Sequence, residues 1–202
     1  TPMTVGIQGE WGSGKTSLLL QIEKSLGEEG SKYKQIWVNA WEHSLLSTPE
    51  ETLIKIIKAV IDEMTFGISD TAKAEQIKKH ASTLFKGAIR VGATMVGGAK
   101  AGEVAEEYFN QDTNTIKSLR KQLGELSQSI STRATNPHER IIIFVDDLDR
   151  VEPKDAVSVL ELLKNIFNIP NCVFILAIDY QVVIKGLEHK FGKRTESNEW
   201  EF

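Results

Sequence analysis

One stretch near the start of the chain, residues 9–16, restricts its possible folds more than any other. It has the pattern G-x-x-x-x-G-K-T. Residues 3–8, before it, are prone to form a β-strand, and residues 17–26, after it, carry apolar residues at helical spacing. A strand, a glycine-rich loop and a helix in this order are typical of a phosphate-binding loop, so the context supports the pattern.

Each residue type in this loop suits a bound phosphate chain. The glycines permit backbone angles closed to other residues and let successive N–H groups turn inward at a helix N-terminus, where the helix dipole also attracts anions. Lys15 is expected to reach the β- and γ-phosphates, and the Thr16 hydroxyl is expected to coordinate Mg²⁺. A glycine-rich turn that matches by chance is the alternative. The predicted nucleotide-binding residues are Gly9, Glu10, Trp11, Gly12, Ser13, Gly14, Lys15, Thr16 and Ser17.

Two adjacent carboxylates follow a strongly apolar run in the second half of the chain. Residues 141–145 are five consecutive apolar residues, mostly β-branched, and predict a strand buried on both faces of a parallel sheet. Ligands bind outside the carboxyl ends of such strands, where Asp146 and Asp147 lie. We predict that Asp146 holds Mg²⁺ through its water shell and that Asp147 orients or deprotonates the attacking water. Acids that only cap the following helix are the alternative.

Two further charged residues have two interpretations each. Arg150 either contacts a phosphate across a subunit boundary or pairs with Asp147 or Asp149, and the pairing is favoured. Asp179 ends a further predicted strand, residues 172–179, and either senses the γ-phosphate or caps the next helix.

Alternating strands and helices along the rest of the chain predict an α/β fold, with a parallel sheet flanked by helices in three layers. Residues 35–41 predict the second strand, which places Trp37 and Trp41 on one face for packing in the core. Residues 49–64 and 153–167 predict helices with core-facing apolar stripes.

Residues 66–135 predict a helical insertion between the second and third core strands of a single domain that spans residues 1–202 and is incomplete at both ends. The apolar seam over 116–130 favours a long helix that docks on this domain. Residues 73–100 are basic, and their longest uncharged run, 91–99, is too short to span a membrane. This segment is expected to contact a membrane surface, a polyanion or another subunit, or to be a solvated excursion.

The overall composition restricts the cellular setting. The net charge of −4 supplies no general reason to expect a nucleic-acid partner. The single cysteine, Cys172, excludes an internal disulfide, and no signal-peptide pattern opens the chain. These features favour the cytoplasm, with membrane association of the full-length protein as an option. Cys172 is interpreted as a small buried residue, and the four histidines lack metal-ligand spacing.

Four motifs together resemble the KAP family of P-loop NTPases, which is grouped with the STAND signalling ATPases. They read V-G-I-Q-G-E-W-G-S-G-K-T, W-V-N-A-W-E, I-I-I-F-V-D-D-L-D-R and F-I-L-A-I-D-Y. Many family members carry transmembrane helices between the second and third motifs, where this chain has Lys86, Arg90 and Lys100. The resemblance implies ATP binding and slow hydrolysis coupled to assembly, in bacterial defence against phage and in membrane-associated signalling. It also implies further C-terminal elements, including a last core strand.

We therefore expect Mg²⁺-dependent binding and hydrolysis of ATP, or another nucleoside triphosphate, as a switch for assembly or signalling. A homo-oligomer or an effector protein is the expected partner. Lys15, Asp147, Asp179 and Arg150 are the predicted catalytic residues, and Thr16 and Asp146 are the predicted metal ligands. The alternative is a non-hydrolysing nucleotide-binding scaffold that presents the basic segment to a partner. A small-molecule kinase is a third option, although no arginine-rich lid follows the loop.

Overall fold

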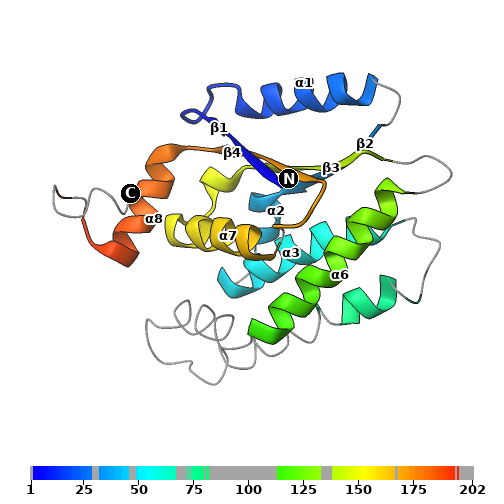
Figure 1. Ribbon diagram of the computed structural model, residues 1–202. Helices are drawn as coiled ribbons and strands as arrows, with labels where there is room; N and C mark the ends of the chain where they lie inside the picture. The colour runs from blue at the N-terminus through cyan, green and yellow to red at the C-terminus, as the bar shows by residue number, and fades with distance from the viewer. Residues whose placement is uncertain are drawn as a thin grey trace.

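A four-stranded parallel sheet organises the protein, as the computed structural model shows (Figure 1). Its strands are β1 (Met3–Gln8), β2 (Tyr33–Asn39), β3 (Arg140–Asp146) and β4 (Cys172–Ile178), in the order β1-β4-β3-β2. The predicted α/β fold with a parallel sheet is thereby confirmed. The structure describes residues 2–28, 32–45, 49–66, 72, 74–79, 81, 113–132, 138–166, 168–193 and 195.

The most apolar strands lie at the centre of the sheet. Almost every residue of β3 and β4 is buried, as expected for β-branched runs covered on both faces. β1 is an edge strand of the described sheet and is largely exposed. Because all four strands are parallel, their carboxyl ends meet at one edge, which brings the ends of β1 and β3 to the same side of the molecule.

Helices cover both faces of the sheet, so the fold has three layers (Figure 1). Helix α1 (Lys15–Glu28) covers one face, where Leu19 packs with Phe144 and Ile175. Helices α3 (Pro49–Thr65), α6 (Thr113–Ser131) and α7 (Pro153–Ile166) cover the other. Alternate residues of β3 point to opposite faces, as the period of two requires: Phe144 faces α1 and Ile143 faces α3.

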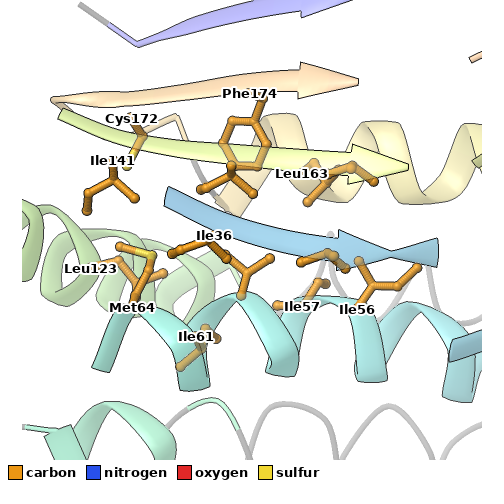
Figure 2. Close-up of a cluster of buried hydrophobic side chains, with 14 of the residues drawn as sticks. Ile36, Ile56, Ile57, Ile61, Met64, Leu123, Ile141, Leu163, Cys172 and Phe174 are labelled. Carbon is orange, nitrogen blue, oxygen red and sulfur yellow. The ribbon is translucent and has the colours of Figure 1, made fainter. Parts of the chain in front are cut away.

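The larger core lies between the sheet and the three helices on its second face (Figure 2). Ile56 and Ile57 of α3 lie on the side of the helix that faces the strands, and Met64 of the same helix lies beside Leu123 of α6. The apolar seam predicted for α6 is confirmed as a core contact, since its members at positions 119, 123, 126 and 130 are at most 1% exposed. These helices therefore hold the sheet on the side opposite to α1.

The predicted second strand ended too late. β2 stops at Asn39, and α2 (Ala40–Ser44) begins directly after it. The Asn39 side chain accepts a hydrogen bond from the Glu42 amide and caps α2, which ends the extended run. Consequently Trp37 and Trp41 do not share a strand face. Trp37 stacks on Phe144 with ring centroids 5.4 Å apart, whereas Trp41 is 37% exposed.

Much of the predicted insertion lies outside the described residues, including residues 82–112, which contain most of the basic segment 73–100. Within it, residues 74–79 and α6 are helical, and Ile77 is buried in the larger core. The insertion as a unit therefore stays a prediction. No helix within the described ranges combines the length and the apolar character needed to cross a bilayer.

Candidate phosphate-binding site

The loop between β1 and α1 has the backbone shape that its glycines allow. Gly12 and Gly14 have φ angles of 81° and 88°, in the region that favours glycine. A side chain at Gly9 would overlap the Ser13 hydroxyl. The Gly9 amide donates to the Ile178 carbonyl at 3.3 Å, so the loop is joined to the end of β4. The loop therefore opens at the carboxyl edge of the sheet, next to the ends of β3 and β4.

Lys15 is buried although the loop residues around it are exposed. Its ammonium nitrogen donates to the carbonyl oxygens of Gly9 at 2.9 Å and Glu10 at 3.0 Å. It also forms an ion pair with the Asp149 carboxylate at 2.9 Å, and both side chains are less than a tenth exposed. Lys15 is thus folded back over its own loop and paired with an acid from the turn after β3.

Thr16 and Asp146, the two predicted metal ligands, lie together. The Thr16 hydroxyl donates to Asp146 Oδ1 at 3.2 Å, and the Asp147 amide donates to the same oxygen at 2.9 Å. Asp146 is only 3% exposed. A hydroxyl and a carboxylate oxygen side by side are hard ligands of the kind that Mg²⁺ prefers. The fold thereby joins residues from α1 and β3 that are far apart in the sequence.

Asp147 is held by two side chains. It has a left-handed backbone conformation, with φ 56° and ψ 27°. Its Oδ1 pairs with Arg150 Nε at 2.7 Å and its Oδ2 accepts from Asn39 Nδ2 at 3.1 Å. The favoured pairing of Arg150 is confirmed, and the Arg150 guanidinium also lies over the Trp41 ring, 5.3 Å from its centroid. These contacts fix the carboxylate of Asp147 against the start of α2.

The turn after β3 directs its charged residues to different places. It contains the short 3₁₀ helix η1 (Leu148–Arg150), and Leu148 is fully buried in the larger core. With Leu148 anchored there, Asp149 reaches Lys15 while Arg150 reaches back to Asp147. Asp149 was considered from the sequence only as a partner of Arg150, so its contact with Lys15 is new. The sequence did offer a signal for this contact, because Asp149 is a third acid only three residues after the predicted metal ligand Asp146.

The remaining predicted residues lie at the rim of the site. Asp179 caps α8 (Tyr180–Phe191), and its Oδ1 accepts from the Gln181 amide at 2.8 Å, as the cap interpretation predicted. Trp11 is 78% exposed on the loop. Asn39 was missed as a site residue, although its position at the end of the second predicted strand was a signal. It lies in register with Asp146 across the β2–β3 pair.

Among the described residues, no three His, Cys, Asp or Glu side chains are grouped closely enough to hold a metal ion. A metal at Thr16 and Asp146 would therefore need further oxygen ligands from a bound phosphate chain and from water, which is how Mg²⁺ is usually held with nucleotides. The two residues fit that arrangement, since one is a hydroxyl and the other a carboxylate.

Comparison with known proteins agrees with this geometry. The family model described as the KAP family P-loop domain matches residues 1–202. The chain is 24% identical to the Phage T7 exclusion protein of Escherichia coli strain K12 over 209 residues, a match that covers 92% of this chain and 27% of that protein. It is 28% identical over 148 residues to an uncharacterized protein of Methanocaldococcus jannaschii, covering 73% of this chain and 66% of that protein. The family expected from the four motifs is confirmed.

Proposed function

Because the chain belongs to the KAP family of P-loop domains, we propose that it binds a nucleoside triphosphate, ATP in the first instance, together with Mg²⁺. The observation that carries the proposal is the meeting of Thr16 and Asp146 beside the Lys15 ammonium at the carboxyl edge of a parallel sheet. In P-loop NTPases the phosphate loop and an acid at the end of another parallel strand act together in this way.

Each residue has a role in this proposal. The loop amides of residues 9–17 cradle the phosphate chain, and Lys15 neutralises its charge at the β- and γ-positions. Thr16 and Asp146 hold the metal, Asp146 through water. When bound, Mg²⁺ neutralises the developing charge on the phosphate oxygens.

We further propose that the site hydrolyses the triphosphate. Asp147 is the candidate for orienting the attacking water. A carboxylate can accept about four hydrogen bonds, so its contacts with Asn39 and Arg150 leave room for a water. Asp179 lies at the end of the neighbouring strand, where it can respond to the γ-phosphate through its cap on α8. Arg150 then orients Asp147 within this chain. Its alternative role is to contact a phosphate across a subunit boundary.

Hydrolysis is proposed to work as a switch for assembly or signalling, with a homo-oligomer or an effector protein as partner. The Phage T7 exclusion protein supports a role in excluding phage, which we extend to this chain as a proposal. The chain spans about a quarter of that relative, so the output of the switch is proposed for the full-length protein. Contact of the basic segment 73–100 with a membrane surface or a polyanion stays a prediction.

The test is ATP turnover by the full-length protein with Mg²⁺, together with its mass with and without nucleotide. Lys15→Ala and Asp146→Asn are expected to lower turnover by at least about a hundredfold, because one removes the cation at the phosphates and the other removes the metal ligand. Glu152→Gln, an exposed acid three residues after Asp149, is the matched control and should keep wild-type turnover.

Four outcomes separate the alternatives. Turnover no faster than buffer, with nucleotide still bound, favours the non-hydrolysing scaffold. Wild-type turnover in Asp147→Asn contradicts the role of Asp147 while leaving the binding site intact. Transfer of the γ-phosphate to an added acceptor and not to water would favour a kinase. A mass that does not depend on nucleotide contradicts the switch in assembly.

A further inference from the structure

The Lys15 ammonium has an oxygen acceptor for each of its three N–H donors. Two are carbonyl oxygens of its own loop, Gly9 and Glu10, and the third is the Asp149 carboxylate at 2.9 Å. An ammonium group has three donors and no acceptor. A phosphate oxygen that binds Lys15 must therefore take the place of one of these partners.

Asp149 is the partner that a phosphate most resembles. It is an anion, and its side chain is 7% exposed beside a lysine that is 8% exposed. The two carbonyl oxygens belong to the loop that forms the cradle itself and carry no net charge. Asp149, by contrast, lies on η1 after β3 and is not part of the loop that forms the cradle.

The other acids of the site are held elsewhere. Asp146 accepts from Thr16 and from the Asp147 amide, and Asp147 is held by Arg150 and Asn39. Asp149 thus contributes the negative charge that the structure places directly on Lys15.

We propose that Asp149 is an internal competitor for Lys15, which occupies the position of a phosphate group and must be displaced before a nucleotide's phosphate chain can bind. This inference rests on the proposed nucleotide binding and adds a residue that sets its affinity. Only a ligand whose phosphate chain reaches Lys15 has to displace the acid, so the competition weakens the binding of di- and triphosphates and leaves the binding of ligands with a shorter chain unchanged. Displacement also frees an acid next to the terminal phosphate.

The experiment measures binding of ADP in EDTA by isothermal titration calorimetry. Without Mg²⁺, any role of Asp149 as a metal ligand drops out. Asp149→Asn keeps the size of the side chain but removes the charge, so ADP is expected to bind about tenfold more tightly than to wild type. Glu152→Gln removes the same charge from an exposed position nearby and should change the dissociation constant by less than about twofold.

Thermal unfolding of the same proteins separates competition from a structural role. Asp149→Asn should lower the melting temperature without ADP and enlarge the increase caused by saturating ADP, because the complex no longer loses an ion pair on binding. A structural role would lower both melting temperatures without tightening ADP binding. Asp149→Ser serves as a second variant if Asp149→Asn does not fold.

Unchanged or weaker ADP binding in Asp149→Asn or Asp149→Ser, with wild type still binding ADP, would overturn the competition alone. Equal tightening in Glu152→Gln would also overturn it, since the effect would then be general electrostatics. Failure of the wild-type protein to bind ADP would contradict the proposed function itself and this inference with it.

Discussion

At the residue scale, the ion pair between Lys15 and Asp149 determines how the site tolerates substitution. Both side chains are almost fully buried, so each charge depends on the other for compensation. The pair between Arg150 and Asp147 is different, because the Arg150 side chain is 41% exposed and solvent screens it. The first pair is therefore expected to matter for stability and the second mainly for orientation.

Lys15→Ala is expected to destabilise the fold by about 3 kcal/mol, because it leaves the Asp149 carboxylate buried without its cation. Urea unfolding measures the effect. The double variant Lys15→Ala with Asp149→Ala removes both charges and should recover part of the loss. If the double variant lost the full sum of the two single effects, the pair would carry no coupling.

At the element scale, the packing of α8 on α7 depends on one glycine. A Cβ at Gly186 would overlap the Pro153 carbonyl oxygen and crowd Val157. Since α8 follows directly from Asp179, this contact also positions the end of β4 at the site. The close packing of α8 on α7 at Gly186 therefore also affects where Asp179 lies.

Gly186→Ala is expected to cost about 1–3 kcal/mol by forcing α8 away from α7, more than alanine gains in helix propensity. Gly6→Ala is the matched control, because a Cβ at Gly6 meets nothing within 4 Å. Chemical denaturation of both variants checks this. A similar stability for the two would contradict the close contact.

A second prediction at this scale concerns α6, the helix expected from the sequence to dock on the domain. Leu123→Ala should lower the free energy of unfolding by about 2–5 kcal/mol, because Leu123 is fully buried between α6, α3 and the sheet (Figure 2). Lys121→Ala on the exposed side of the same helix should change it by less than about 0.5 kcal/mol. Equal effects in urea denaturation would mean that α6 does not pack in the core.

At the scale of the whole molecule, Cys172 reports on unfolding of the core. It lies at the start of β4, at the end of the sheet opposite to the site, as the sequence predicted. Burial raises the pKa of its thiol from 9.0 to about 12, and a hydrogen bond with Ser127 partly offsets this. The neutral thiol is therefore favoured in the folded protein over the unfolded one.

Because the folded pKa is the higher one, the unfolded state releases its proton first, and stability should fall as the pH rises above 9. The difference in unfolding free energy between wild type and Cys172→Ala isolates the thiol. Relative to Cys172→Ala, wild type should lose up to about 1.4 kcal/mol of unfolding free energy for each pH unit above pH 9. A difference that stays constant from pH 8 to 10 would contradict the raised pKa.

The positions of the strands, the glycine-rich loop and the helices could be predicted from the sequence, because they depend on residues that are close together in the chain. The glycines of the loop at 9–16, the apolar runs of β3 and β4 and the helical stripes of α3 and α6 predicted the fold class and placed Thr16 and Asp146 in one metal site at the edge of the sheet. The family was predicted from the resemblance of four motifs. These patterns reflect backbone freedom and burial, which act over a few residues. The end of β2 was less predictable, since a cap at Asn39 competes with the strand.

Only the tertiary structure decided which acid contacts which cation. Residues 146–150 offer three acids and one arginine, and the sequence could not show which acid contacts which cation. Burial of Leu148 in the core orients this turn, which sends Asp149 to Lys15 and joins Asp147 to Arg150 and Asn39. Such contacts depend on the relative placement of three parallel strands, β1, β2 and β3. No local pattern carries that information, because it arises from packing between segments far apart in the chain.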